Sequence, residues 1–100
     1  MPFEAVCFYV YVLTSQRNGT LYIGVTNSLL ARVQAHRNGT GSVFTRRYKV
    51  FLLVHFEQFT SVSEAIQRET SLKRWPRKWK VDLIEAENPS WRDLWLDLAE

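Results

Sequence analysis

Residues 6–25, VCFYVYVLTSQRNGTLYIGV, hold two apolar runs separated by a polar turn. The first run, Val6 to Leu13, is apolar on both alternating faces and rich in β-branched and aromatic residues, which predicts a central strand covered on both sides. The turn contains Arg17-Asn18-Gly19-Thr20, and its Asn-Gly pair tolerates the positive φ of a tight hairpin. We therefore expect Leu21 to Val25 to return as an antiparallel second strand.

Beyond this hairpin the chain changes to a helical pattern and then returns to a strand. A first short helix can be capped by Asn27 or Ser28, and it is expected to end near Asn38-Gly39, where glycine suits a left-handed stop. Residues 40–49 are basic and lack apolar periodicity, which predicts a mobile loop. A third strand is expected from Val50 to Phe59.

The remaining residues have mostly helical spacing. A helix over residues 61–75 is indicated by apolar residues at helical intervals, namely Val62, Ala65, Ile66 and Leu72. Pro76 ends that helix and can open another that runs through Ile84. The spacing of Ser90 and Asp93 resembles a capping box and predicts a short final helix, which docks through Trp91, Leu94, Trp95 and Leu98.

Size and composition limit the class of protein. The chain has 100 residues, 46% apolar and 14% aromatic, which is enough for one core, so we expect a single domain over residues 1–100 with residues 88–100 as a C-terminal docking segment. Cys7 is the only cysteine, which excludes an intrachain disulfide and a cysteine-based zinc site. No basic start precedes an apolar stretch, and the longest apolar run, Val50 to Phe56, is too short to span a bilayer. We expect a soluble cytoplasmic protein with no membrane partner; a monomer is favoured.

The charges are distributed unevenly along the chain. The net charge is +3, and most of the 13 basic residues lie between Arg32 and Lys80, whereas acidic residues predominate after position 81. This distribution predicts a positive face that can meet a polyanion, and a merely solvated surface is the alternative.

Glu69 lies in the middle of the apolar stripe predicted for residues 61–75, because the apolar side chains fall within about 60° of it at 100° per residue. An isolated buried charge costs several kcal/mol, so this carboxylate must be paired, protonated or bound to a cation. A salt bridge to an internal arginine and a carboxylate that reaches outward are the alternatives to a cation site. Arg32 and His36 are four residues apart on the first helix and can reach a common cleft, although such pairs often form a solvated edge.

Two tyrosines of the hairpin are further candidates. Tyr11 ends one predicted strand and Tyr22 begins the other, so their phenols can be neighbours, while core packing is the usual reason for a tyrosine in a strand. Gly24 lies inside the second strand, where a glycine often marks the close approach of another backbone or a ligand.

The spacing of these candidates resembles a known pattern. Tyr9-Val10-Tyr11, ten intervening residues and Tyr22-Ile23-Gly24 are similar to the paired tripeptides of the GIY-YIG nuclease superfamily, with Tyr9 and Val10 in place of the first glycine and isoleucine. Arg32, ten residues after Tyr22, matches the arginine of that family, and Glu69 resembles its metal-binding glutamate. The tail Asn88-Pro89-Ser90-Trp91 is similar to that of standalone members of about this length.

The resemblance implies a fold and a chemistry. The fold is α+β, a small three-stranded antiparallel sheet flanked by helices in the order β-β-α-β-α-α. The activity is that of an endonuclease that cleaves DNA, with RNA as a possible partner, directed by DNA structure and linked to DNA repair or processing. Glu69 would hold a single Mg²⁺ or Mn²⁺, and Arg32 would brace the phosphate. Tyr22 would accept the proton of the attacking water, with His36 as the alternative base, while Tyr11 would orient water or phosphate.

Basic residues in two segments are predicted to contact phosphates: Arg46, Arg47 and Lys49 in the expected loop, and Lys73, Arg74, Arg77, Lys78 and Lys80 near Pro76. Trp75 and Trp79 lie among the latter, where they either stack on unpaired bases or pack in the core. Two other functions stay open: a non-catalytic nucleic-acid-binding module on the same fold, and an adaptor that binds proteins through its acidic, Trp-rich tail.

Overall fold

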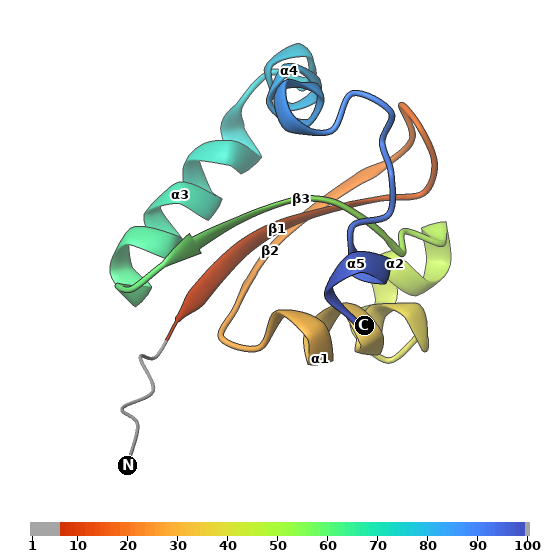
Figure 1. The fold of residues 1–100 in the computed structure, drawn as a ribbon, viewed down its shortest axis with the longest axis horizontal. Helices are drawn as coiled ribbons and strands as arrows, with labels where there is room; N and C mark the ends of the chain where they lie inside the picture. Colours follow the sequence, from red (N-terminus) through yellow and green to blue (C-terminus); the bar gives the residue numbers. More distant parts are fainter. Residues whose placement is uncertain (1–6, 100) are drawn as a thin grey trace.

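The computed structural model describes residues 7–99, which form a three-stranded antiparallel sheet with helices on both faces (Figure 1). This α+β arrangement and the β-β-α-β-α-α order confirm the predicted fold; the short final helix expected in the tail is also present, and one further short helix, α2, is added. The elements are β1 (Phe8–Thr14), β2 (Leu21–Thr26), α1 (Leu29–Arg37), α2 (Val43–Tyr48), β3 (Leu52–Phe59), α3 (Val62–Arg74), α4 (Arg77–Glu87) and α5 (Trp95–Leu98).

Strand β1 is the centre of the sheet, whose order is β2-β1-β3. Tyr11 of β1 is paired with Gly24 of β2 and with Phe56 of β3. The β1–β2 turn has the predicted chemistry, since Asn18 adopts a left-handed φ of 58°. Val6, which the sequence assigned to the first strand, lies outside the described residues. Among residues 7–99, β2 pairs with β1 alone, so its outer edge has no neighbouring strand there.

Each face of the sheet is covered by its own group of helices (Figure 1). Val10 and Val12 of β1 face α3 and α4, where they pack with buried apolar residues of both helices. Tyr11 and Leu13 point to the other face, where α1 and the C-terminal helix α5 lie. The central strand is therefore apolar on both faces, as its sequence predicts.

The prediction of a mobile loop over residues 40–49 is wrong, because α2 occupies most of that segment. Ser42 caps the helix by accepting a hydrogen bond of 3.1 Å from the Thr45 backbone N–H. Lys49 ends it in the left-handed conformation with φ 55°. The helix has one buried residue, Thr45, and that is why apolar periodicity gave no signal.

The predicted stripe on α3 is narrower than expected. Ala65 and Leu72 are fully buried, but Val62 and Ile66 are each 48% exposed. The capping box predicted at Ser90 does not form either, since α5 begins at Trp95. Within residues 7–99, no helix combines the length and apolar character needed to cross a membrane.

Residues after α4 are tied to β3 by buried polar contacts. The Asn88 side chain donates to the backbone oxygens of Val54 (3.1 Å) and Arg92 (2.9 Å), and it accepts from the Arg92 N–H (3.0 Å). Asp93 accepts from the backbone N–H of Leu53 at 3.1 Å and pairs with Arg37 at 2.7 Å. These contacts hold the C-terminal segment against the sheet.

Candidate active site

The site is built around Tyr11, which is 1% exposed at the centre of the sheet. Gly24 lies opposite it on β2, and a Cβ at Gly24 would stand 2.4 Å from the Tyr11 hydroxyl oxygen and 2.5 Å from its Cζ. The missing side chain therefore gives the phenol room to lie across β2. This is the close approach that a glycine inside a strand indicates, and the group that fills the space is a side chain of the same hairpin.

His36 of α1 is fully buried behind this phenol. Its Nε2 lies 3.0 Å from the Tyr11 hydroxyl and its Nδ1 lies 2.8 Å from Thr45 Oγ1. Gly41 leaves space for the ring, since a Cβ there would be 2.3 Å from Nδ1. The sequence reasoning missed both Gly41 and Thr45. The local signal for Thr45 was its spacing from Ser42, which is that of a helix cap. Gly41 had no local signal.

Arg32 reaches the same group from the previous turn of α1. Its Nη2 donates to the backbone oxygen of Gly41 at 3.0 Å. A hydrogen-bonding contact with Tyr11 raises the pKa of Arg32 above its ordinary value, and Tyr22 contributes in the same direction. The guanidinium is thus anchored on one side and keeps further N–H groups for an anion.

Both ring nitrogens of His36 are engaged, Nε2 with the Tyr11 hydroxyl and Nδ1 with Thr45 Oγ1. Each of these hydroxyls can donate or accept, so either tautomer of the neutral ring is satisfied. Burial, assisted by the charge of Arg32, lowers the pKa of His36 to about 4, so the imidazole is neutral at pH 7 and able to accept. Burial raises the pKa of Tyr11, which is therefore a neutral phenol at the same pH.

Tyr22 is half-buried on the open side of this cluster. Its ring centroid is 5.2 Å from that of His36 and 6.3 Å from that of Tyr11. It also lines a cleft of about 340 Å³ that follows the outer edge of β2, together with Leu21, Ile23, Phe44, Lys73 and Lys80. The structure thus brings Tyr11, Tyr22, Arg32 and His36 together, with Tyr22 as the ring that borders the cleft.

Glu69 comes from α3, on the other side of the open sheet edge. Its side chain is 16% exposed, and its carboxylate lies 3.5 Å from Lys73 Nζ. The charge of Glu69 contributes to raising the pKa of Tyr11, so the two groups are within electrostatic range. The carboxylate is largely withdrawn from solvent even though its neighbours Val62 and Ile66 are exposed.

The donors present fit a cation that needs few protein ligands. Among residues 7–99, no group of three or more His, Cys, Asp or Glu side chains is placed to hold a metal ion. A site with one carboxylate leaves most of the coordination shell to water and phosphate, which is typical of Mg²⁺ and unlike structural zinc. Glu69 is the residue that would hold such an ion.

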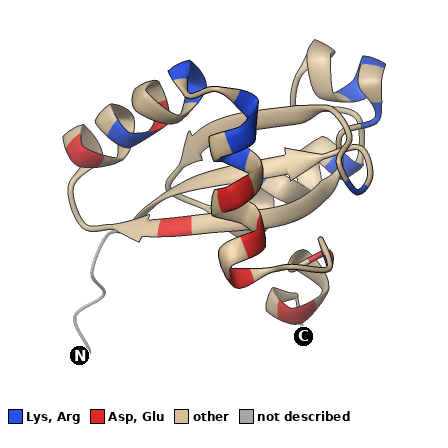
Figure 2. Ribbon diagram, turned by 90° about the horizontal axis from the view of Figure 1, so that it is seen from above, with Lys and Arg blue, Asp and Glu red and all other residues tan. Residues whose placement is uncertain are grey.

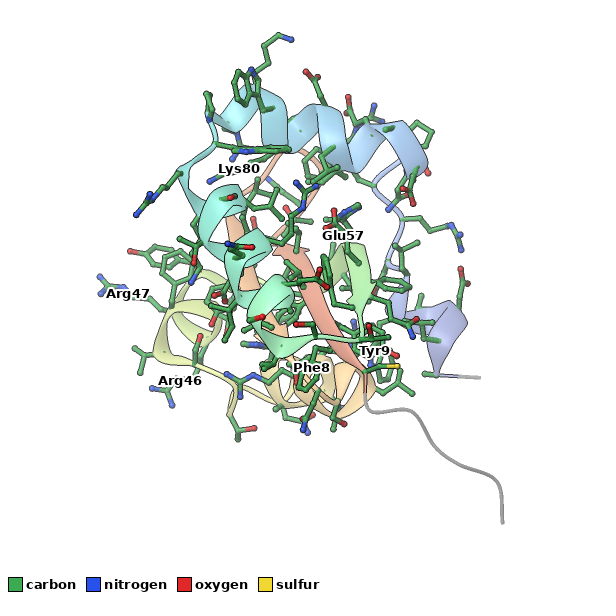
Figure 3. The ribbon with its side chains drawn as sticks, turned by 90° about the vertical axis from the view of Figure 1, so that its left-hand side faces the viewer. Phe8, Tyr9, Arg46, Arg47, Glu57 and Lys80 are labelled. Carbon is green, nitrogen blue, oxygen red and sulfur yellow. The ribbon has the colours of Figure 1, made fainter. Side chains whose placement is uncertain are left out.

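The predicted phosphate-binding residues gather at two places (Figure 2). Arg46 and Arg47 extend outward from α2, and Lys80 lies on the same side of the molecule near the α3–α4 junction (Figure 3). Exposed bases accompany them, namely Lys49 after α2 and Lys73, Arg74, Arg77 and Lys78 around the junction. Acidic residues occupy the second half of α4 and the tail (Figure 2).

Some of these bases already have partners within the chain. Arg77 donates to the backbone oxygens of Asn18 and Gly19, at 2.8 and 2.7 Å, and Lys78 pairs with Asp82 at 3.1 Å. Trp79 is 54% exposed, so it is not the core residue that helical spacing favours. Asn88 does not take part in the cluster, since its side chain holds the tail.

Two tyrosines, an arginine and a histidine thus gather at one edge of the sheet, and a largely buried glutamate lies within electrostatic range of them. The chain belongs to the GIY-YIG catalytic domain family, whose model matches residues 7–82. This match confirms the resemblance seen in the sequence.

The chain is also similar to UPF0213 proteins that it covers over most of their length. The chain is 42% identical over 77 residues to the UPF0213 protein of Oceanobacillus iheyensis, covering 77% of this chain and 88% of that protein. It is 40% identical over 80 residues to the UPF0213 protein of Clostridium perfringens, covering 80% and 85% of the two. A solution NMR structure of the UPF0213 protein from Bacillus halodurans is similar, with a TM-score of 0.55, 30% identity and coverage of 87% of this chain and 92% of that one.

Proposed function

We propose that this member of a nuclease family is a Mg²⁺- or Mn²⁺-dependent endonuclease that hydrolyses DNA phosphodiester bonds in a structure-directed way, in cytoplasmic DNA repair or processing. The observation that supports this proposal most is the largely buried carboxylate of Glu69, which lies within electrostatic range of Tyr11 and next to Lys73, a residue that lines the cleft. A carboxylate so placed needs a positive partner, and in this proposal Arg32, which interacts with Tyr11 and Tyr22, binds the phosphate.

Arg32 is suited to bind the phosphate group that is attacked. Its contact with the Gly41 backbone oxygen fixes the guanidinium before substrate arrives, so less rotamer entropy is lost on binding. The remaining N–H groups can donate to two phosphate oxygens, where negative charge grows in the transition state.

Tyr22 is the better placed of the two candidate bases. His36 is fully buried and both of its ring nitrogens are engaged, so water in the cleft does not reach it. Tyr22 borders the cleft with Lys73 and Lys80, where water beside a bound phosphate can reach its hydroxyl. In this proposal His36 is a positioning residue, which is hydrogen-bonded to Tyr11 and so orients that phenol.

A divalent cation held by Glu69 would supply Lewis-acid stabilisation of the phosphate charge. The position of Glu69 also allows an alternative function. Lys73 already lies 3.5 Å from Glu69, and a permanent ion pair there would neutralise the carboxylate without metal. A protein of that kind would be a non-catalytic module that binds nucleic acid through its basic face.

Cleavage assays separate these two functions. Purified protein is incubated with supercoiled plasmid, flap and branched DNA in Mg²⁺ or Mn²⁺, beside Glu69→Gln, Arg32→Ala and the matched control Glu64→Gln, whose carboxylate is exposed on the same helix. We expect cutting by the wild type and by the control, and a loss of about 100-fold or more in the other two variants. Cutting that persists in Glu69→Gln and Arg32→Ala would reveal a contaminant, and retention of DNA without any cutting would favour the non-catalytic module.

A further inference from the structure

Helix α2 presents two aromatic rings beside the candidate active site. Phe44 is 41% exposed and Tyr48 is 48% exposed, so each leaves a large part of an apolar ring in solvent, where it is available to a ligand. The ring centroids form a short path out of the cleft: Tyr22 to Phe44 is 6.0 Å, and Phe44 to Tyr48 is 4.8 Å. This aromatic step begins at the phenol proposed to act as the base and ends in solvent.

The surroundings of the aromatic step carry positive charge. Arg46, Arg47 and Lys49 lie on α2 or directly after it, and residues 42–49 contain no acidic side chain. The Arg47 guanidinium lies over the Tyr48 ring, 5.6 Å from its centroid. Exposed rings among arginines favour a ligand that is both flat and anionic, which is the chemistry of a nucleotide.

We propose that Phe44 and Tyr48 form a stacking platform for an unpaired base next to the phosphate that is cut, so that the substrate class is DNA with unpaired nucleotides at the cleavage position. This inference rests on the proposed nuclease function and specifies its substrate. A base inside a duplex is covered on both faces by its neighbours and cannot lie on a wall of protein rings, whereas an unpaired base has a free face.

The outer ring of the platform is separate from the groups that perform the chemistry. Phe44 adjoins Tyr22, Tyr48 stacks on Phe44, and Thr45, on the buried side of the same helix, is the residue of α2 that contacts His36. Loss of the rings is therefore expected to weaken binding of unpaired DNA more than it changes the fold, because both side chains are already substantially exposed.

Binding is measured without metal, so that cleavage is not needed for the readout. Fluorescence anisotropy compares a labelled single-stranded DNA with a duplex of the same sequence, for the wild type, Tyr48→Ala and Phe44→Ala/Tyr48→Ala. Val43→Ala is the matched control, since Val43 is 71% exposed on the same helix. Phe44→Trp tests whether any aromatic ring restores the platform.

We expect the wild type and Val43→Ala to bind the single strand more tightly than the duplex. The double variant should bind the single strand about 5- to 150-fold more weakly, which corresponds to one stacked base at about 1–3 kcal/mol, with little change for the duplex. Tyr48→Ala should show a smaller loss in the same direction, and Phe44→Trp should bind like the wild type.

Three results would overturn the platform: equal losses for both DNA forms, no loss for either, or tighter binding of an RNA strand of the same sequence than of the DNA. Thermal melting of each variant identifies any that fails to fold. If the double variant does not fold, the test is the binding of single-stranded and duplex DNA by Tyr48→Ala, since Tyr48 is the platform ring farther from the cluster. A protein that keeps its preference for single strands but never cuts DNA would refute the nuclease function and leave the platform standing.

Discussion

Replacement of Gly24 by alanine tests the geometry of the proposed site most directly. An added Cβ would lie 2.4 Å from the Tyr11 hydroxyl oxygen and 2.5 Å from Cζ, far inside van der Waals contact. Tyr11 is 1% exposed and cannot move aside freely. Forcing an extra carbon into a packed site costs about 1–3 kcal/mol, whereas alanine in place of glycine inside a strand returns about 0.5–1 kcal/mol. The difference is a net destabilisation of between about 0 and 2.5 kcal/mol.

The effect on activity should exceed the effect on stability. Displacement of the Tyr11 phenol disrupts its hydrogen bond to His36. A misplacement of about 1 Å near reacting atoms can lower the rate by about 100-fold. Urea unfolding measures the free energy of unfolding, and cleavage of a DNA substrate measures the rate for the folded fraction.

A double-mutant cycle tests whether Tyr11 is the residue with which the added Cβ of Gly24→Ala clashes. In a Tyr11→Ala background the clash is removed, so Gly24→Ala should there be neutral or stabilising by about 0.5–1 kcal/mol. An equal cost of Gly24→Ala in both backgrounds would show that Tyr11 is not the obstacle. Full activity of the single Gly24→Ala variant would refute the claim that the phenol must lie across β2.

Three further predictions concern pH, the tail and salt. Burial keeps His36 neutral, with a pKa of about 4 in the folded protein against about 6.5 in the unfolded chain. As pH falls from 6.5 to 4 the unfolded state therefore takes up the proton first, and the free energy of unfolding should decrease by about 3 kcal/mol. Urea unfolding of His36→Asn should be nearly flat in that window, since the pKa of Glu57 is lowered to about 2 and its contribution is lost mainly below pH 4.5. Asn88→Ala removes three hydrogen bonds and should lower the unfolding free energy by about 2–3 kcal/mol while cleavage per folded molecule changes little; a selective loss of cleavage would contradict the structural role. Arg46→Ala and Arg47→Ala should each reduce the slope of log binding constant against log salt by about 0.7 for single-stranded DNA, and an unchanged slope would remove that arginine from the interface.

The elements that the sequence predicted well are those specified by local chemistry. The Asn18-Gly19 turn and the two-sided apolar pattern of residues 8–13 depend on neighbours in the chain, and both give the expected hairpin. Helices α3 and α4 have regular spacing around Pro76, which separates them. The proline and the turn act over a few residues, so they can be recognised without knowledge of the rest of the fold.

Features that the sequence missed depend on contacts made after folding. Helix α2 is held by a cap at Ser42 and by Thr45, whose hydroxyl contacts a histidine nine residues earlier in the chain. Asn88 bonds to the backbone of Val54, 34 residues away, and no local pattern indicates that contact. The apolar stripe predicted on α3 is wider than the buried one, because Val62 and Ile66 have helical spacing but each remains 48% exposed.

The candidate site depends both on local sequence spacing and on contacts that form only in the folded chain. The spacing of Tyr11, Tyr22 and Arg32 points to the GIY-YIG family, but spacing does not show which group is accessible. Burial separates His36, whose ring nitrogens are both occupied, from Tyr22, which borders the cleft. The choice between the two candidate bases therefore depends on solvent access, a property of the folded chain.

Helix α2 connects the two halves of the proposed mechanism. Its buried face supplies Thr45, which fixes the imidazole that in turn orients Tyr11, and its exposed face supplies the two rings proposed to receive an unpaired base. A six-residue helix with one buried side chain has little packing energy of its own. Its position depends on the cap at Ser42 and on the hydrogen bond to His36, so a base that stacks on the outer face stabilises the same segment that positions the inner one. If both proposals hold, substrate binding and the alignment of Tyr11 are linked through Thr45, and a duplex that makes no stacking contact would gain no such stabilisation.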